Sequence, residues 1–372
     1  MKYPFKKWSH RLSCFLIILS MLFSLFGCAT TSQKEKISVS WFDADGSLIA
    51  TEVIDADTSP SYRNLPSDTD LWHYTGWSIS KSGNVTVCTA TRQAKTQVIW
   101  KDCDGTVLKK TYFFEKDKEP VFDLPKSNDK WTYTGWASEH KENKIVYTAE
   151  RVPNLSYFCG NVFQIIIKDK NGEPIKSGSG FVINSEGWFV TNDHVMENGY
   201  SATAFFDIPN TATGAKYTSL NISGGVYHDS NKDIFIGKLD NYQKLKQYYH
   251  ILSFTETYAE GDVCYSVGYP NSSVNLKIHE GSILEDYSDI YDKINGNRYI
   301  LSDSYIAPGS SGGILVDQKF QIIGITSMGL YADSNKTVYI SGGSIPYSAF
   351  KANLKNLNAA NLKTLNVIYG IH

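Results

Sequence analysis

Three features are missing from this sequence, and each absence excludes a class of protein. Its eight histidines show no pairing at the spacing of metal ligands, so no motif for a metal site is present. No apolar run long enough to span a bilayer follows the first 27 residues. Positive charge is not in excess, because 36 Lys and Arg stand against 38 Asp and Glu, and this balance argues against a nucleic-acid partner.

Residues 1–27 have the composition of a targeting segment. An apolar stretch from Phe15 to Leu25 follows a basic start, and Gly27-Cys28 closes the segment in a way that resembles a bacterial lipobox. We therefore predict a lipoprotein signal peptide with Cys28 as the lipidated first residue, and a short transmembrane anchor is the alternative. The basic residues before the apolar stretch are Lys2, Lys6, Lys7 and Arg11. Their removal leaves 32 cationic against 38 anionic side chains, a net charge near −6.

Cysteine is scarce, with six in 372 residues. Beyond Cys28, four lie in two regions of the chain, and cysteines outside the cytosol can form disulfides. The sequence leaves their pairing open. These four residues are Cys88, Cys103, Cys159 and Cys264.

Residues 37–152 contain an internal repeat with a constant spacing of 59 positions. The matched pairs include Trp41 and Trp100, Gly46 and Gly105, Trp72 and Trp131, Trp77 and Trp136, and Arg92 and Arg151. After a linker at 28–36, we predict two small β-rich repeats at 37–93 and 96–152. Asp45-Gly46 and Asp104-Gly105 are the sequences of hairpin turns between alternating strands.

The acidic residues of these turns also allow a calcium-loop interpretation. Both turns lack the third acid, and Ile54 and Phe113 stand where an EF-hand needs glutamate, so a structural turn is favoured. The repeats loosely resemble the β-grasp-like modules of bacterial surface proteins, such as internalin-type B repeats. We expect them to act as a stalk, and binding of an envelope partner through their aromatic residues is the alternative.

The segment 302–316 carries a serine among glycines and ends in an apolar strand. Gly309 lets a tight turn close, so that the backbone N–H groups of Gly309 and Ser311 can point together at a developing oxyanion. Ser311 is therefore a candidate nucleophile. An ordinary flexible loop is the other interpretation of Ser-Ser-Gly-Gly.

Two upstream segments favour the catalytic interpretation. His194 follows the apolar run 188–190, and Asp233 stands at the start of the apolar run 234–239. Strand ends can bring an orienting acid, a base and a nucleophile together from distant parts of a chain. Asp193 and Asp303 are competing candidates for the acid.

The pattern Gly309-x-Ser311-x-Gly313 also satisfies the nucleophile elbow of α/β-hydrolases. In those enzymes the acid and the histidine follow the serine along the chain. Only His372 follows Ser311 here, and a residue so near a chain end is poorly suited to precise positioning.

Residues 155–355 resemble a trypsin-fold serine protease, most closely the HtrA/DegP branch. The family blocks Gly-Ser-Gly-Phe, Thr-Asn-x-His-Val, Asp followed by an apolar strand, and Pro-Gly-x-Ser-Gly-Gly occur in order at 178–181, 191–195, 233–236 and 308–313. This resemblance implies a double β-barrel in which Ser311 attacks, His194 is the general base and Asp233 orients the imidazole. It also implies an oxyanion hole at Gly309, Ser310 and Ser311.

The chain departs from the family in several places. About 20 residues follow Phe350, enough for a terminal helix such as 349–366 but not for a PDZ domain, and we assign residues 356–372 to a C-terminal helix or tail. Ser310 replaces the aspartate with which trypsin-like zymogens capture a new N-terminus, so we expect no activation of that kind. By the resemblance, the specificity pocket holds uncharged residues and favours a small to medium apolar side chain. The expected pocket residues are Tyr305, Ser327, Met328 and Gly329.

Together these features predict a mainly β protein whose trypsin-like double β-barrel follows two tandem, β-grasp-like repeats. We expect a serine endopeptidase of protein or peptide substrates that needs no metal or organic cofactor. It would be held to the bacterial cell envelope by lipidated Cys28, on the extracytoplasmic side. The alternative function is a latent or non-catalytic surface binding protein that keeps the protease fold.

Overall fold

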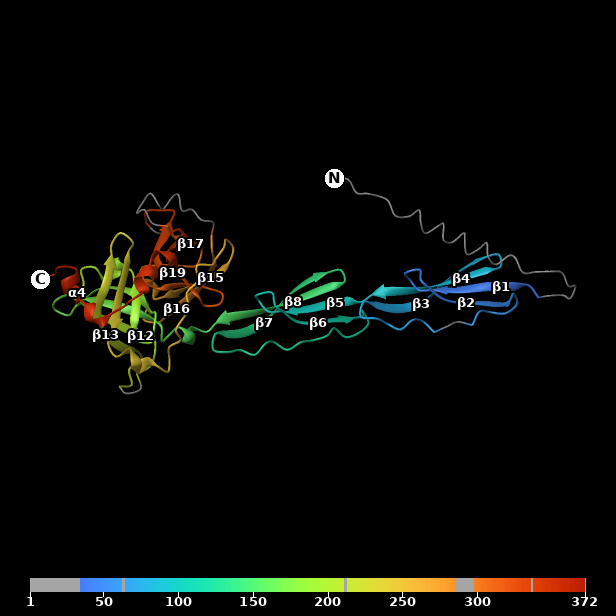
Figure 1. Ribbon diagram of the computed structural model, residues 1–372, viewed down its shortest axis with the longest axis horizontal. Helices are drawn as coiled ribbons and strands as arrows, with labels where there is room; N and C mark the ends of the chain where they lie inside the picture. Colours follow the sequence, from blue (N-terminus) through green and yellow to red (C-terminus); the bar gives the residue numbers. More distant parts are fainter. Residues whose placement is uncertain (1–33, 62–63, 211–212, 285–297, 336, 372) are drawn as a thin grey trace. The chain divides into compact units, whose positions relative to one another are not determined.

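The computed structural model describes residues 34–61, 64–210, 213–284, 298–335 and 337–371 (Figure 1). The predicted leader and Cys28 lie outside the described residues. The chain divides into two compact units, one of residues 1–123 and 136–149, the other of residues 124–135 and 150–372. Within the described residues, no helix is both long and apolar enough to cross a membrane.

The first unit begins with a four-stranded mixed sheet. Its strands are β1 (Lys36–Phe42), β2 (Leu48–Asp55), β3 (Trp72–Ser82) and β4 (Val85–Ala94), in the order β2-β1-β4-β3. The two central strands, β1 and β4, run parallel. Val39, Trp41 and Cys88 form the small buried core of this sheet.

A second sheet repeats this strand order. Its strands are β5 (Thr96–Lys101), β6 (Val107–Phe113), β7 (Trp131–Lys141) and β8 (Lys144–Pro153), in the order β6-β5-β8-β7 with β5 and β8 parallel. The Asp-Gly turns lie where we expected them. In each turn the first aspartate N–H donates to a carbonyl four residues on, from Asp43 to Ser47 and from Asp102 to Thr106, both at 2.8 Å.

The 150–372 segment contains a closed six-stranded antiparallel barrel. Aromatic side chains fill it because its strands are rich in Phe, and Phe163, Phe189, Phe206 and Phe235 are fully buried. The strands follow the order β10-β11-β14-β13-β12-β9. Their bounds are β9 (Val162–Lys168), β10 (Pro174–Val182), β11 (Trp188–Thr191), β12 (Ser201–Phe206), β13 (Thr218–Asp229) and β14 (Ile234–Leu239).

A second six-stranded sheet follows, in the order β16-β15-β18-β19-β20-β17. An antiparallel bridge between Ile283 and Ser302 joins its two outer ends, which makes it barrel-forming. Its strands are β15 (Val263–Gly268), β16 (Lys277–Ser282), β17 (Ile300–Ser302), β18 (Ile314–Asp317), β19 (Ile322–Tyr331) and β20 (Tyr339–Pro346). The mainly β, double-barrel prediction is confirmed.

The helix expected at 349–366 is wrong. The structure has short 3₁₀ turns, η4 (Tyr347–Ala349), η5 (Lys351–Leu354) and η6 (Ala359–Asn361), and one turn of α-helix, α4 (Leu365–Ile368). Asparagine is the cause, because its side chain competes for backbone hydrogen bonds and tolerates left-handed backbone. Asn356 has φ +61°, and the Asn358 side chain accepts from the Ala360 N–H at 2.9 Å.

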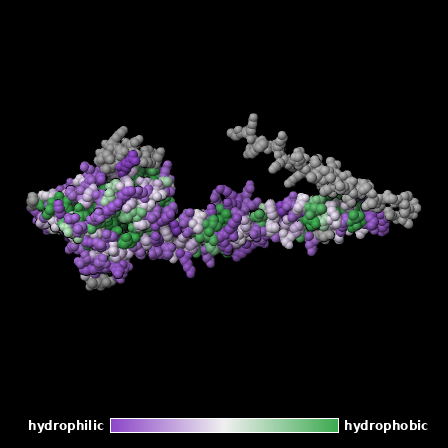
Figure 2. All heavy atoms as spheres, viewed as in Figure 1, coloured by the Kyte–Doolittle hydropathy of each residue, from purple (hydrophilic) through white to green (hydrophobic). Residues whose placement is uncertain are grey.

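The four described cysteines form no disulfide with one another. Cys88 and Cys264 are buried inside sheets, Cys159 is half-buried and Cys103 is exposed in a turn. Hydrophilic residues cover most of the face in Figure 2, and hydrophobic residues appear there as separate patches. Many of the hydrophobic side chains are instead buried in the cores of the sheets and barrels.

Candidate active site

His194 and Asp233 lie at neighbouring strand ends of the first barrel. β11 ends at Thr191, and His194 lies in the single turn α2 (Asp193–Met196) that follows. Asp233 immediately precedes β14, which pairs with β11. It has φ +58°, a left-handed conformation that aspartate tolerates. The strand pairing therefore delivers both side chains to one end of the barrel.

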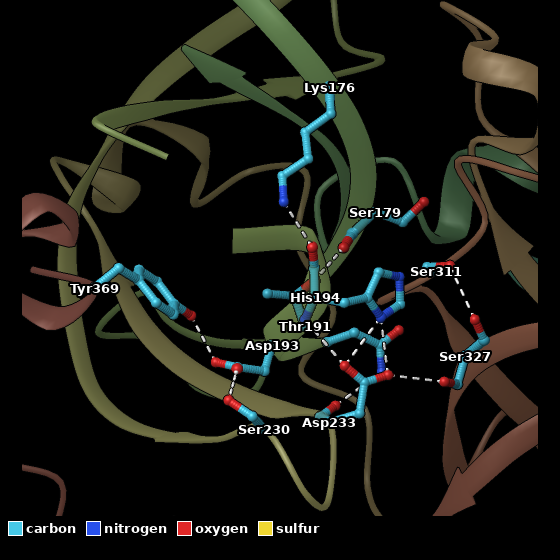
Figure 3. Close-up of polar contacts among 11 residues, drawn as sticks. Lys176, Ser179, Thr191, Asp193, His194, Ser230, Asp233, Ser311, Ser327 and Tyr369 are labelled. Carbon is cyan, nitrogen blue, oxygen red and sulfur yellow. Dashed lines mark hydrogen bonds and ion pairs between the residues drawn. The ribbon is translucent and has the colours of Figure 1, made fainter. Parts of the chain in front are cut away.

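The two side chains are in direct contact (Figure 3). His194 Nδ1 lies 2.9 Å from both carboxylate oxygens of Asp233, and the His194 backbone N–H donates to Oδ1 at 3.0 Å. Because an ionised carboxylate only accepts, Nδ1 carries the proton and Nε2 is left with its lone pair. The imidazole is thus oriented as a base.

Further contacts fix this pair. Ser327 Oγ donates to Asp233 Oδ2 at 2.9 Å, and Asn192 Nδ2 donates to the Asp233 carbonyl at 3.0 Å. Lys176 Nζ donates to the His194 carbonyl at 2.7 Å. Burial lowers the pKa of Lys176 from its ordinary value. Sequence analysis missed Lys176 and assigned Ser327 only to the specificity pocket, because neither contact is signalled by spacing along the chain.

Ser311 lies beside the His194 ring in Figure 3, in the segment between β17 and β18. Its hydroxyl donates to the Ser327 carbonyl at 2.9 Å. Among the described residues, no hydrogen bond joins Ser311 to His194. A rotation about χ1 of Ser311 is therefore needed before its proton can pass to the imidazole.

The segment before Ser311 forms a tight turn, as the oxyanion hypothesis expects. Ser310 N–H donates to the Ala307 carbonyl at 2.9 Å, and with Pro308 second and Gly309 third at φ +96° this is a type II turn. The Pro308 carbonyl accepts from Asn271 N–H at 2.6 Å. Because a trans peptide sets N–H opposite C=O, the Gly309 N–H points away from that bond. Within the described part of the chain, no acceptor is bound to the Gly309 or Ser311 N–H.

Ser179, which is fully buried, holds this turn from the first barrel. Its hydroxyl donates to the Gly309 carbonyl at 2.7 Å and accepts from Tyr269 N–H at 3.0 Å. Its backbone N–H donates to the Ser311 carbonyl at 2.7 Å. The Gly-Ser-Gly-Phe block therefore positions the nucleophile turn from the other barrel.

The expected pocket residues divide into two groups. Ser327 and Met328 on β19 line a cavity of about 630 Å³ that His194 and Asp233 also line, whereas Tyr305 and Gly329 are not among its lining residues. Tyr305 is 38% exposed, and its ring lies 5.3 Å from the rings of both His279 and Tyr339. The other lining residues of the cavity are Ser230, Asn231 and Tyr299.

Neither competing acid contacts the His194 ring. Asp303 Oδ1 accepts from Ser282 N–H at 2.6 Å, across the second sheet. Asp193 is buried and accepts hydrogen bonds from Tyr369 and Ser230. Asp233 is the carboxylate that the structure sets against the imidazole.

Comparison with known proteins identifies the same region. Residues 178–325 match the family model of the trypsin-like peptidase domain. A probable periplasmic serine endoprotease, DegP-like, of Brucella suis is 29% identical over 182 residues, which are 48% of this chain and 32% of the relative. Serine protease Do-like HtrA of Lactobacillus helveticus is 30% identical over 177 residues, 45% of this chain and 40% of the relative.

Among solved structures, the HtrA-type protease AlgW with tripeptide matches with a TM-score of 0.44 and 23% identity, over 56% of this chain and 63% of that one. The chain spans about a third of the Brucella relative and two fifths of the Lactobacillus relative. His194, Asp233 and Ser311 all lie inside the matched domain.

Proposed function

From the trypsin-like peptidase domain at residues 178–325, we propose that this protein is a serine endopeptidase with Ser311 as nucleophile, His194 as base and Asp233 as orienting acid. The observation that carries the proposal is the His194–Asp233 pair, with both carboxylate oxygens 2.9 Å from Nδ1. That geometry leaves Nε2 as a proton acceptor beside a serine whose turn offers two free N–H donors.

The reaction follows from these groups. Ser311 rotates away from the Ser327 carbonyl and attacks the scissile carbonyl carbon, while His194 Nε2 takes the hydroxyl proton. The Gly309 and Ser311 N–H groups stabilise the oxyanion. When the C–N bond breaks, the imidazolium returns the proton to the leaving amine. Water, deprotonated by the same imidazole, then hydrolyses the acyl-enzyme. Apart from the substrate and this water, the steps use only side chains and backbone of the chain.

For the cleavage preference, we retain a neutral, small to medium apolar residue before the scissile bond. Tyr305, Ser327, Met328 and Gly329 contribute no fixed charge to the expected pocket. A library of fluorogenic peptides that varies this residue tests the preference. Strict selection of Arg or Lys would contradict it.

The cell envelope is the proposed location, with Cys28 carrying the lipid. The lipobox-like sequence supports this, as does the description of the Brucella relative as a probable periplasmic protease. Residues 37–152 would then serve as a spacer or bind an envelope partner. Metabolic incorporation of an alkynyl fatty acid into the wild type, but not into Cys28→Ser, is the expected result. Equal labelling of both would refute the anchor.

One observation favours a second candidate, a latent or non-catalytic binding protein. The Ser311 hydroxyl is hydrogen-bonded to the Ser327 carbonyl, so the nucleophile is not paired with its base in this structure. Capture of a partner that survives Ser311→Ala, without proteolysis by the wild type, is the expected behaviour of such a protein.

A fluorophosphonate probe separates the two functions. It forms a bond from Ser311 Oγ to phosphorus and releases fluoride, and it needs an activated serine but no known substrate. We expect labelling of the folded full-length protein in detergent, and none of His194→Ala or Ser311→Ala. A folded wild type that stays unlabelled would favour the binding protein.

A further inference from the structure

A second buried carboxylate lies one residue before His194. The Asp193 side chain is only 3% exposed. Its Oδ1 accepts from the Tyr369 hydroxyl at 2.5 Å and its Oδ2 from Ser230 Oγ at 2.6 Å (Figure 3). A carboxylate removed from water needs such donors to remain ionised. The two hydroxyl groups therefore hold the Asp193 carboxylate in one place.

Tyr369 is well suited to this task because it remains a donor. Burial, and then the hydrogen bond to Asp193, raise the pKa of Tyr369 far above its ordinary value. The phenol therefore keeps its proton at neutral pH and donates it to the carboxylate. The ring of His228 lies 5.4 Å from the ring of Tyr369, and His228 Nδ1 lies 3.6 Å from Asp193 Oδ1.

The segment that carries Tyr369 is anchored to the first barrel. Gly225 and Lys363 exchange two backbone hydrogen bonds, both 2.9 Å long. Leu365, the first residue of α4, is 3% exposed and belongs to the aromatic core of this barrel. Tyr369 follows the last turn of α4. Residues 363–369 thus form a strap that runs along the barrel and ends on Asp193.

The position of Asp193 links this strap to the catalytic pair. Asp193 begins the turn α2 that carries His194, and Ser230 lies in the loop between β13 and β14 that carries Asp233. One carboxylate therefore ties the base-bearing turn, the acid-bearing loop and the strap together. Loss of either hydroxyl donor leaves the buried Asp193 carboxylate short of a hydrogen bond. This carboxylate lies next to the 2.9 Å contacts between His194 and Asp233.

We propose that Tyr369 is a positioning residue of the active site, which fixes His194 against Asp233 through Asp193. This inference deepens the proposed protease function and rests on it. The Tyr369 hydroxyl donates to Asp193, and Tyr369 is not among the residues that line the cavity beside His194, so we expect its effect on the chemical step rather than on binding. A misplacement of catalytic groups by about 1 Å can lower a rate by up to ~10²-fold.

The test measures fluorophosphonate labelling of the full-length protein in detergent as two constants, KI for binding of the probe and kinact for the bond-forming step. For Tyr369→Phe we expect kinact to fall about tenfold with KI unchanged. Tyr242→Phe is the matched control, because it also loses a buried tyrosine hydrogen bond in the first barrel, from Tyr242 to the Gly160 carbonyl at 2.8 Å. The bond that is lost goes to Gly160 and not to α2 or the β13–β14 loop, and we expect kinact of Tyr242→Phe to stay within twofold of the wild type.

The outcomes separate the two claims. A wild-type kinact in folded Tyr369→Phe overturns the positioning role and leaves the protease function standing. An equal fall of kinact in both variants also overturns it, because the effect is then one of general stability. An unlabelled wild type refutes the protease function itself. Should Tyr369→Phe not fold, Ser230→Ala decides, since it removes the other donor to Asp193 and is expected to lower kinact in the same way.

Discussion

Replacing Gly309 by alanine should damage the oxyanion turn far more than it destabilises the fold. The residue has φ +96°, and a Cβ built on it would lie 2.5 Å from the Tyr269 carbonyl oxygen and 3.0 Å from Ser272 N. Both neighbours are backbone atoms, so neither can swing away as a flexible side chain would. The turn itself must rotate, and with it the Gly309 N–H.

The size of the effect has two parts. An alanine in a left-handed conformation costs about 1–3 kcal/mol wherever it occurs. Loss of one oxyanion donor costs a further factor of roughly 10²–10³ in rate. Gly172 isolates the first part, because it has φ +86° in an exposed turn and a Cβ there would meet nothing within 4 Å.

The assay compares Gly309→Ala with Gly172→Ala by thermal unfolding and by the rate of fluorophosphonate labelling. We expect Gly172→Ala to lose a few degrees in Tm, at about 2–4 °C per kcal/mol, and to label at the wild-type rate. Gly309→Ala should label at least about a hundredfold more slowly. If the two variants label within a factor of about two of each other, the assignment of the Gly309 N–H to the oxyanion hole is refuted.

Three further predictions follow from the same contacts. Gly312→Ala should fail to give soluble folded protein, because its Cβ would lie 2.1 Å from both the Ser179 carbonyl oxygen and Thr191 Oγ1; a cooperative unfolding transition like that of the wild type would contradict this. Asp233→Asn should slow labelling by about 10⁴-fold while the fold survives, because an amide no longer imposes the Nδ1–H tautomer on the imidazole. Burial raises the pKa of Cys264 to about 12, so the thiol holds its proton at pH 8, and iodoacetamide followed by mass spectrometry should modify exposed Cys103 but not Cys264 in native protein.

Some parts of the candidate site could be predicted because they depend on residues that are close together in the sequence. His194 and Asp233 each flank a short apolar run, and pairing of those runs as β11 and β14 brings the two side chains together. The turn at Gly309 follows from Pro-Gly and its left-handed φ. Pro-Gly restricts the backbone by itself, so this turn can be predicted from a single sequence. The preference for Asp233 over Asp193 and Asp303 needed the family pattern as well as the apolar run that follows it.

Contacts between distant segments could not be predicted in this way. Tyr369 and Asp193 are 176 positions apart, and nothing in either local sequence distinguishes them from an ordinary surface tyrosine and aspartate. The prediction of a helix at 349–366 was wrong because of the local sequence itself. Apolar residues at helical spacing were present, but the asparagines between them favour turns, and turns formed.

Trp131 shows that a repeat pattern does not predict how deeply a repeated residue is buried. It is equivalent to Trp72, 59 positions earlier, and each tryptophan ring is covered by the equivalent arginine, Arg92 at 4.3 Å and Arg151 at 4.1 Å.

Their surroundings nevertheless differ. Trp72 remains partly exposed, whereas Trp131 is 5% exposed and lies 4.4 Å from Phe320 in the core of the unit that contains the active site. The two local sequences are nearly the same. The difference in burial therefore comes from Phe320, a partner far along the chain. We therefore expect Trp131→Ala to lower the free energy of unfolding of that unit by about 3–5 kcal/mol. We expect Trp72→Ala to leave the rate of fluorophosphonate labelling unchanged.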